Sequence, residues 1–546
     1  MIKLVSIVFA LLLGLSPAAD AQAPVTVTVT PRLVRQHFGG PGFHAEMFLD
    51  TATPQFYDQV LSKRWKEMNP RFARIMLHRA RSTDADPLQR LAQQINFLKN
   101  ATGTEVYLTG GLEEAPEGEA RKQWADHLAG ELETLLQSGA TNIKWHCITN
   151  ELSLHGWASM RRDLPTFHAY EQALYDAIES RHLPIKILAT DASPITNWNT
   201  IQWAAENMDG IVGVYGGHHY LNDYAPDDPA AYNWFMEKCA WAVGIAKSKG
   251  KDFILGEFGP RQYQQLRWGA RWDVAYAYGT PAEPMAGLQL AEAATAAINA
   301  GVYAMGYWTF VDYPDQDGGS RGVNHWGLFR WMSAGATPRA PYYSYSLMTR
   351  FFRGPASVYR VETGDPLVRA AAIRNEETGA WSIAVINREP RAVSLSIALA
   401  AEPDKAFRKY VYDTAHVPVT EDGDLQGPSG KIAAAGRGFS DTVAPESLAV
   451  YTTAYHDGAP ASVRGLTATQ QGDATALRWE PSPEKDICYY RIYQNNVRIG
   501  SSTKPEFVDA GPTRHQPGDY TVIAVDQSGN ASQPSRVSRS PRNRSK

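Results

Sequence analysis

DFILGEFGP, residues 252–260, is an apolar run that ends on Glu257 between two glycines. A short apolar run bounded by turn residues is typical of a strand that is buried on both faces. Glycine lets the backbone turn sharply at the strand end, so we expect an exposed carboxylate at the mouth of the sheet. IKWHCITNEL, residues 143–152, has the same form and ends on Asn150 and Glu151 before Leu152. The two stretches predict two strands of one sheet, each with a glutamate at its carboxyl end.

Outward from these stretches, strand-like and helix-like segments alternate. The strand-like segments are 37–43, 72–77, 105–109, 143–149, 185–190, 210–215, 253–256 and 303–310. Helical periodicity lies between them, as in the Ala-rich segment 286–299, which stops at Gly301. A (β/α)8 TIM barrel has eight strands that are each followed by a helix, and the predicted segments match this number. An open doubly wound sheet is the alternative, but residues 37–43 (HFGGPGF) lack the glycine spacing of its phosphate loop.

The chain is long enough for several domains. We assign residues 35–355 to the barrel, and short alternating runs predict a β-sandwich over 356–456, which residues 22–34 can extend by one strand. After a break at 456–460, residues 460–535 predict an immunoglobulin-like module with Trp479 in its core. The break predicts few contacts between this module and the rest, so the module should be dispensable for chemistry. Residues 536–546 are basic and aperiodic, as in a disordered tail.

Residues 1–21 have the form of an export signal: Lys3, an apolar run, then a small-x-small site at 19–21. They predict an exported protein, periplasmic or secreted. No other stretch is long and apolar enough for membrane insertion. A net charge of −4 gives no general attraction to nucleic acid, whereas 15 Trp and 26 Tyr suit sugar-binding surfaces. Three widely spaced cysteines predict neither a disulfide framework nor a zinc site, and we expect no cofactor.

TIM barrels carry their active sites at the carboxyl ends of their strands. The side chains that we expect there, besides Glu151 and Glu257, are Arg74, Asn150, His218, Tyr220 and Trp308. Two glutamates are what hydrolysis of a glycosidic bond requires, and Asn150 can bond a sugar hydroxyl. Arg74 would keep a neighbouring carboxylate ionised, Tyr220 could orient it, and Trp308 could form a floor under a sugar ring. A buried ion pair for Arg74 and a core position for Trp308 are the structural alternatives.

Two patterns could suggest metal sites. His218 and His219 are adjacent on a strand and so point to opposite faces, which argues against a shared metal ion. The acidic run 312–319 lacks the glutamate that closes an EF-hand loop, so a solvated loop is the better interpretation. We therefore predict no metal site.

The predicted strands carry one set of residues: Arg on the second strand, Asn-Glu ending the fourth, His-x-Tyr on the sixth, Glu ending the seventh and Trp on the eighth. This set resembles the clan A glycoside hydrolases, among them families 5, 30, 39 and 51. The resemblance covers residues 35–355. The sandwich, introduced by Arg339-Ala340-Pro341-Tyr342, looks like the accessory domain of families 30, 39 and 51, and the terminal unit is similar to fibronectin type III modules. Leu152 stands where many members have proline, which leaves the family open.

The resemblance implies a retaining glycosidase in which Glu257 is the nucleophile and Glu151 the acid/base. Its substrate would be a plant or microbial polysaccharide or oligosaccharide. Repulsion from ionised Glu257 should keep Glu151 protonated, and the two carboxyl groups should lie about 5–5.5 Å apart. The alternative is an inactive protein that binds carbohydrate through its aromatic surface. We expect a monomer or a weak oligomer.

The sugar is open. Arginine and tryptophan side chains near the carboxyl ends of strands two and seven could bind an acidic glycan: Arg79, Arg81, Arg261, Arg267, Trp268, Arg271 and Trp272. The alternative, which we favour, is that these arginines pair with nearby acids such as Asp273 and Glu283. A neutral pentose- or hexose-based glycan is then the expected substrate.

Overall fold

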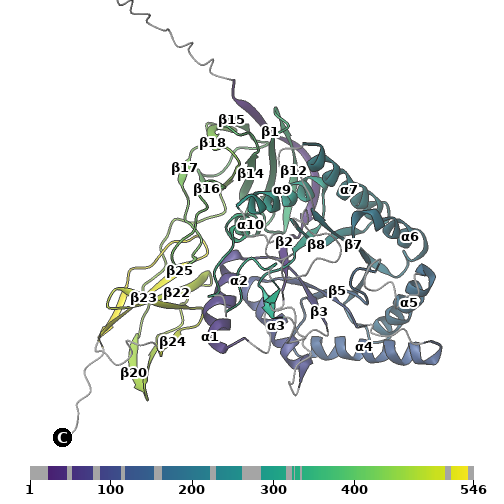
Figure 1. Cartoon of the computed structure of the whole chain (residues 1–546), viewed down its shortest axis with the longest axis horizontal. Helices are drawn as coiled ribbons and strands as arrows, with labels where there is room; N and C mark the ends of the chain where they lie inside the picture. The colour runs from purple at the N-terminus through teal and green to yellow at the C-terminus, as the bar shows by residue number, and fades with distance from the viewer. Residues whose placement is uncertain are drawn as a thin grey trace, which may run out of the picture.

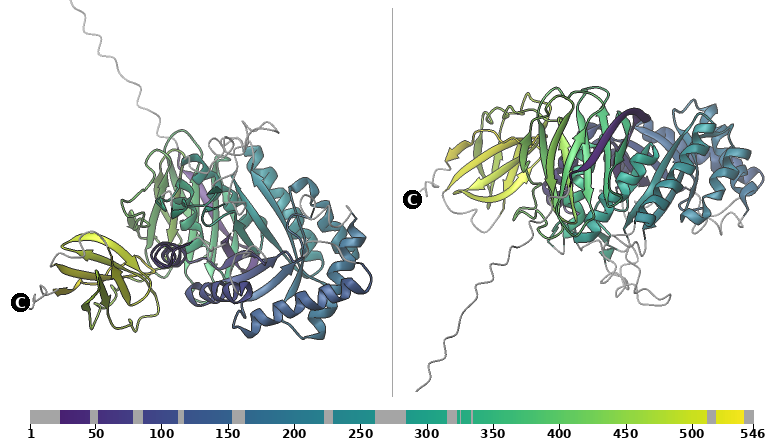
Figure 2. Two further views of the ribbon diagram at one scale, coloured as in Figure 1. Left: turned by 60° about the horizontal axis from the view of Figure 1, so that its bottom comes forward. Right: turned by 90° about the horizontal axis from the view of Figure 1, so that it is seen from above.

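The chain folds into a barrel, a β-sandwich and a terminal all-β lobe (Figures 1 and 2). The structure is a computed structural model, and it describes residues 23–45, 52–77, 86–111, 117–152, 163–221, 229–260, 284–314, 323–324, 326–332, 335–510 and 518–538. The predicted export signal, Arg79, Arg81 and the arginine- and tryptophan-rich segment 261–278 lie outside the described residues. None of the helices in the described part of the chain combines the length and apolar character that crossing a membrane requires.

Eight parallel strands close into the predicted TIM barrel, which is confirmed. They are β2 (Gly40–His44), β3 (Phe72–Met76), β4 (Glu105–Thr109), β5 (Ile143–Cys147), β6 (Lys186–Ala192), β7 (Val212–Leu221), β8 (Asp252–Pro260) and β9 (Ala304–Tyr307). The deciding stretch is β8, which is buried from Phe253 to Pro260 as a strand with two covered faces should be.

Helices surround the barrel (Figure 1). They are α1 (Pro54–Phe56), η1 (Tyr57–Leu61), α2 (Ser62–Met68), α3 (Pro87–Thr102), α4 (Glu119–Gln137), α5 (Leu164–Ser180), η2 (Ile195–Asn197), α6 (Asn199–Asn207), α7 (Pro229–Ser248), α9 (Pro284–Ala300) and α10 (Ala340–Phe351). Local chemistry sets several ends: Asp86 caps α3 by accepting a hydrogen bond from the Gln89 amide at 2.9 Å, and Gly103 ends it with φ +64°. Asp163 caps α5 in the same way.

A nine-stranded sheet follows the barrel, in the order β17-β16-β19-β14-β13-β12-β1-β15-β18. Its strands are β1 (Val25–Phe38), β12 (Ala356–Thr363), β13 (Val368–Asn375), β14 (Trp381–Asn387), β15 (Val393–Ala398), β16 (Phe407–Asp413), β17 (Gly430–Ile432), β18 (Gly438–Val443) and β19 (Ser447–Thr452). The first strand of the chain thus lies inside this sheet, antiparallel to β12 and parallel to β15, and leads directly into the barrel.

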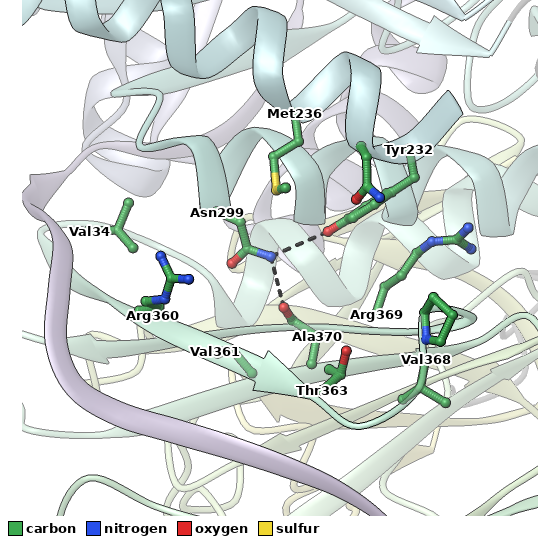
Figure 3. Close-up of a pocket in the computed structure, with 12 residues that line it drawn as sticks. Val34, Tyr232, Met236, Asn299, Arg360, Val361, Thr363, Val368, Arg369 and Ala370 are labelled. Carbon is green, nitrogen blue, oxygen red and sulfur yellow. Dashed lines mark hydrogen bonds between the residues drawn. The ribbon is translucent and has the colours of Figure 1, made fainter. Parts of the chain in front are cut away.

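Helix α9 joins the barrel to this sheet. It packs against barrel helix α7 on one side and contacts strands β12 and β13 on another. It is buried along almost its whole length, which explains its alanine content, because small side chains let both layers approach the helix closely. Glu292 of α9 pairs with Arg369 of β13 in this layer, and a pocket lies at the same seam (Figure 3).

The terminal lobe consists of two small sheets. One contains β20 (Thr467–Gln471), β21 (Ala474–Arg478) and β24 (Glu506–Asp509), and the other β22 (Ile487–Gln494), β23 (Val497–Ser502), β25 (Asp519–Asp526) and β26 (Ser535–Ser538). Trp479 and Tyr520 lie in the core between them. The likeness of this lobe to a fibronectin type III module stays a prediction. Strand β26 extends the lobe past residue 535, into the segment that we predicted to be a disordered tail.

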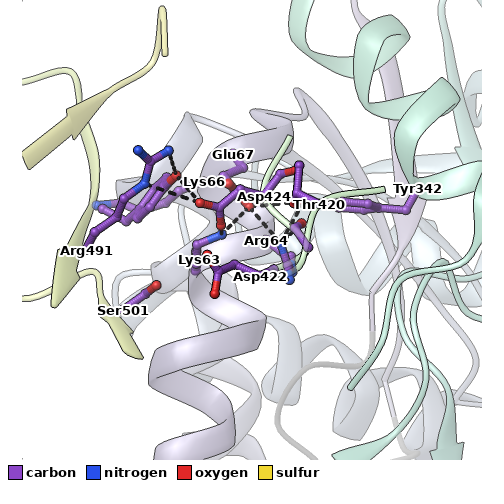
Figure 4. Close-up of polar contacts among 12 residues, drawn as sticks. Lys63, Arg64, Lys66, Glu67, Tyr342, Thr420, Asp422, Asp424, Arg491 and Ser501 are labelled. Atoms are coloured by element: carbon purple, nitrogen blue, oxygen red, sulfur yellow. Dashed lines mark hydrogen bonds and ion pairs between the residues drawn. The ribbon is translucent and has the colours of Figure 1, made fainter. Parts of the chain in front are cut away.

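The prediction of few contacts between the terminal lobe and the rest is wrong. Asp424, in the loop between β16 and β17, accepts a hydrogen bond from Lys63 of α2 at 2.7 Å (Figure 4). It also accepts one from Arg498 of β23 at 2.7 Å. Lys63 Nζ also lies 4.4 Å from the ring centre of Tyr489 on β22. One buried carboxylate therefore connects the barrel, the sandwich and the terminal lobe. The residues that form this junction lie far apart in the sequence, so no local sequence pattern predicts it.

Asp424→Asn is expected to lower the free energy of unfolding by about 3 kcal/mol, because it removes the carboxylate that Lys63 and Arg498 share and leaves Glu67, 2.9 Å from Lys63 Nζ, as the remaining counter-charge of Lys63. Burial opposes ionisation of Asp424, but Lys63 and Arg498 outweigh it and hold the pKa below its usual range. The stabilisation is thus present above the ordinary pKa of an aspartate, about 3.9, and is lost as the pH falls through the lower folded-state pKa.

Asp422→Asn is the matched control. Its side chain is 45% exposed and also bonds Arg498, so we expect a loss below about 1 kcal/mol. Urea denaturation at neutral pH measures both variants. Equal, small losses would show that the buried network does not hold the three units together.

Candidate active site

Six of the seven predicted site residues form one hydrogen-bonded cluster at the carboxyl ends of the barrel strands. They are Arg74 of β3, Asn150 and Glu151 just beyond β5, His218 and Tyr220 of β7, and Glu257 of β8. Trp308, just beyond β9, packs against Tyr220. The barrel thus gathers in space side chains that are spread from residue 74 to residue 308 of the chain.

The two glutamates lie side by side. A carboxylate oxygen of Glu151 and one of Glu257 are within 4.8 Å of each other, and His218 Nδ1 lies 3.3 Å from Glu151 and 3.7 Å from Glu257. Glu257 is only 3% exposed, so the expectation of an exposed carboxylate is wrong. The reason is that neighbouring strand ends supply charged and hydroxyl partners that cover it.

Arg74 is one of two fully buried cations in the cluster. Its guanidinium donates to Glu257 Oε1 at 2.6 Å, to Asn150 Oδ1 at 2.6 Å and to Asp191 Oδ2 at 2.9 Å. Burial alone would lower the pKa of Arg74, but the carboxylates of Asp191 and Glu257 outweigh it and raise the pKa above the usual range. Tyr220 donates its hydroxyl to the other oxygen of Glu257. Both oxygens of Glu257 therefore accept hydrogen bonds.

Asp191, at the end of β6, is a residue that sequence reasoning missed. It is fully buried and bridges Arg74 to His218, whose Nε2 lies 2.8 Å from Asp191 Oδ1. Burial disfavours its charge, but His218 and Arg74 lower its pKa to about 2. The predicted strand ended at Thr190, one residue before Asp191, whereas β6 continues to Ala192. An acid directly after a strand was the available signal, as it was for Glu151.

His218 is held as a cation between three acids. Burial by itself would lower its pKa, but Asp191 first and then Glu257 raise it to about 9. With both ring nitrogens protonated, Nε2 donates to Asp191 and Nδ1 to Glu151. His219 points to the other side of the strand, packs against Trp234 and Phe235, and has its pKa lowered to about 4 by burial. The two histidines therefore face opposite ways, as strand alternation predicts.

An aromatic wall stands beside the carboxylates. His44 at the end of β2 lies against Trp308, with ring centres 4.1 Å apart, and Trp326 packs edge-on to Trp308 at 6.4 Å. His44 was also missed, because the predicted strand stopped at Phe43. An aromatic wall next to two carboxylates is an arrangement that can hold a sugar ring by its apolar face.

The cluster Glu151, His218 and Glu257 has the spacing to hold a metal ion. Its charges do not suit one, because the protonated His218 has no free lone pair and Arg74 already neutralises Glu257. The residues fit proton transfer and charge stabilisation better than metal binding.

Comparison with known proteins identifies the class of fold. The bacterial orthologue of human α-L-iduronidase superimposes with a TM-score of 0.58 at 13% identity, over 94% of this chain and 99% of that one. A family 51 α-L-arabinofuranosidase from Thermotoga petrophila RKU-1 gives 0.58 at 14%, over 79% and 100%. A family 30 subfamily 8 xylanase from Clostridium acetobutylicum gives 0.54 at 14%, over 78% and 99%. The chain has the fold of the clan A glycoside hydrolases.

Sequence comparison adds little. No family model matches the chain. Exoglucanase B of Cellulomonas fimi is 27% identical over 133 residues, which are 22% of this chain and 12% of that protein. The match therefore spans about an eighth of the curated relative, and the identification stops at the class of fold.

Proposed function

We propose that the chain is an exported retaining glycoside hydrolase in which Glu257 is the nucleophile and Glu151 the acid/base. The observation that carries the proposal is the pair of carboxylates with oxygens within 4.8 Å of each other. An inverting enzyme needs about 6.5–9.5 Å between its carboxyl groups to admit a water molecule, whereas attack by the carboxylate itself suits about 5–5.5 Å. The close pair supports the double-displacement route.

The partners of each glutamate support its role. Glu257 accepts hydrogen bonds from Arg74 and Tyr220, which stabilise it as an anion and aim it at the anomeric carbon. Attack forms the bond from Glu257 to that carbon and breaks the bond to the departing oxygen, which takes the proton of Glu151. A water molecule then gives its proton to Glu151 and releases the sugar from Glu257.

The charges of the buried cluster suit both steps. Arg74 and His218 carry two positive charges, and Asp191 and Glu257 two negative ones, so a neutral Glu151 leaves the cluster balanced. When Glu257 becomes an ester it loses its charge, and Glu151, having given up its proton, gains one. The balance is then unchanged, which avoids the cost of a net charge in a buried site.

Asp191→Asn tests this balance. The variant removes the anion nearest to His218, so the pair His218 and Glu151 should give up its first proton at a lower pH. We expect the alkaline limb of the kcat/KM profile to move down by about 1–3 pH units, the range for loss of an adjacent opposite charge. The profile is measured with an aryl glycoside.

Asp209→Asn is the control for that prediction, because Asp209 is 37% exposed and pairs with Lys251 outside the site. Its profile should match the parent. An alkaline limb that stays in place in Asp191→Asn would contradict the balanced-charge account.

The proposed substrate is a plant or microbial polysaccharide or oligosaccharide, with a neutral pentose- or hexose-based glycan as the first choice. The names of the proteins of similar fold include xylanase, arabinofuranosidase and iduronidase, so the fold is compatible with neutral and acidic sugars. The wall of His44, Trp308 and Trp326 supports sugar binding of either kind.

A panel of aryl glycosides and polysaccharides, covering pentosides, hexosides and uronides, tests the function. Turnover by the purified chain, and none by Glu257→Gln, is the expected result. The alternative is a carbohydrate-binding protein without activity, and it would be supported if polysaccharide bound while no glycoside in the panel was cleaved.

A further inference from the structure

A pocket lies at the seam between the barrel and the sandwich, and none of the residues that line it belongs to the cluster around the carboxylate pair (Figure 3). Its volume is about 270 Å³, somewhat below the ~300–1,000 Å³ of pockets that enclose a drug-sized ligand. Its walls come from β1, α7, α9, β12 and β13. The side chains used below are Val34, Tyr232, Met236, Asn299, Arg360 and Arg369.

Asn299 places an unused acceptor in this pocket. Its amide nitrogen donates to the Ala370 carbonyl at 2.8 Å and to the Tyr232 hydroxyl at 3.3 Å. Because a carbonyl can only accept, the first bond fixes which end of the amide is nitrogen. Asn299 Oδ1 is then buried with no hydrogen-bond partner among the described residues, and Figure 3 shows it turned toward Arg360. Such an acceptor needs a donor.

Two hydrogen-bond donors, Tyr232 and Arg360, line the same pocket as the Asn299 acceptor. The Tyr232 hydroxyl accepts from Asn299, so its own hydrogen is available, and burial raises its pKa to about 12, so it keeps that hydrogen. Arg360 is half-exposed and pairs through Nε with Glu362 at 3.3 Å, which leaves its terminal nitrogens directed at the pocket. Val34 and Met236 form an apolar side.

We propose that this pocket is a second carbohydrate-binding site, which takes one neutral sugar residue. A sugar hydroxyl is both donor and acceptor, so it can satisfy Asn299 Oδ1 and accept from Arg360 or Tyr232. The apolar face of the ring then rests on Met236 and Val34. A carboxylate suits the pocket less, because it would face the Asn299 oxygen, and Arg369 turns away to pair with Glu292.

The site goes beyond the proposed reaction, since it needs no catalytic residue. We would use the full chain with Glu257→Gln, so that no probe is consumed. Saturation-transfer NMR would measure binding of D-glucose, D-galactose, D-xylose and L-arabinose, with D-glucuronate as the acidic arm. At least one neutral sugar should bind, and Arg360→Ala should weaken it about tenfold, the order expected for losing a hydrogen bond to a charged donor.

Tyr232→Phe should weaken the same sugar while keeping the ring and the fold, which its unfolding midpoint would verify. Glu362→Gln, which removes only the outer partner of Arg360, and Trp308→Ala, in the proposed active site, should leave this binding in place. The proposal is overturned if no neutral sugar binds in a way that depends on Arg360 and Tyr232, or if D-glucuronate alone does. If a neutral sugar bound with these properties to a chain that cleaves no glycoside, the proposed reaction would be contradicted and the proposed second site would still be supported.

Discussion

Glu257→Gln is expected to lower kcat/KM on an activated aryl glycoside by at least about 10⁴-fold, the order of loss that removing a nucleophile causes in other hydrolases. The amide keeps the size of the side chain, and its oxygen can still accept a hydrogen bond from Arg74, but its NH2 group cannot accept from Tyr220 and the side chain cannot attack the anomeric carbon. The initial rate of aryl alcohol release measures the effect. Activity within tenfold of the parent would show that Glu257 is not the nucleophile.

Burial of Glu257 decides which substitution is informative. Glu257→Ala would leave Arg74 and Tyr220 short of a partner in a closed site, and breaking a buried pair costs about 3–5 kcal/mol. Glutamine keeps the volume of the side chain and one hydrogen-bond acceptor, so it avoids part of that loss, although it removes the negative charge that faces Arg74. Thermal unfolding of both variants separates the chemical defect from a folding defect, and we expect the alanine variant to lose more degrees of unfolding midpoint than the glutamine variant.

Glu151→Ala should behave differently from either Glu257 variant. Loss of the general acid should cost about 10²–10⁴-fold on substrates with poor leaving groups and much less on activated ones. The space left by the side chain admits azide, which can attack the glycosyl-enzyme without general-base help. We therefore expect azide to accelerate turnover and to give a glycosyl azide with the configuration of the substrate.

The pattern of rescue distinguishes the two roles. Matched reactions with Glu151→Ala, Glu257→Ala and the parent, each with and without azide, would be followed by NMR of the products. If Glu257→Ala gave the glycosyl azide with the configuration of the substrate and Glu151→Ala gave the inverted azide, the acid/base and nucleophile assignments would have to be exchanged.

The barrel could be predicted because its strands are short apolar runs that stop at glycine or polar residues, as β8 and β5 do. Most of the site followed from the rule that strand ends converge, which placed Arg74, His218, Tyr220 and Trp308 near the two glutamates. Asp191 and His44 were missed because each lies one residue past the predicted strand end. Their importance depends on contacts with Arg74, His218 and Trp308 that only the closed barrel creates.

The junction of the terminal lobe could not be predicted for a different reason. Lys63, Asp424 and Arg498 are charged residues in unremarkable surroundings, and each alone predicts a solvated side chain. Burial makes them partners, and burial depends on how the barrel, the sandwich and the terminal lobe pack. The same holds for Glu257, whose covered position reflects the neighbouring strands rather than its own.

The stereochemistry of the first product tests the double-displacement account most directly. Once the panel has identified a cleaved aryl glycoside, ¹H NMR of the anomeric region during the first turnovers would reveal the configuration of the released sugar before mutarotation. Two successive displacements at one carbon, by Glu257 and then by water, predict a sugar with the anomeric configuration of the substrate. Release of the opposite anomer would contradict the account, because it would mean that water attacks directly and that Glu257 never bonds to the sugar.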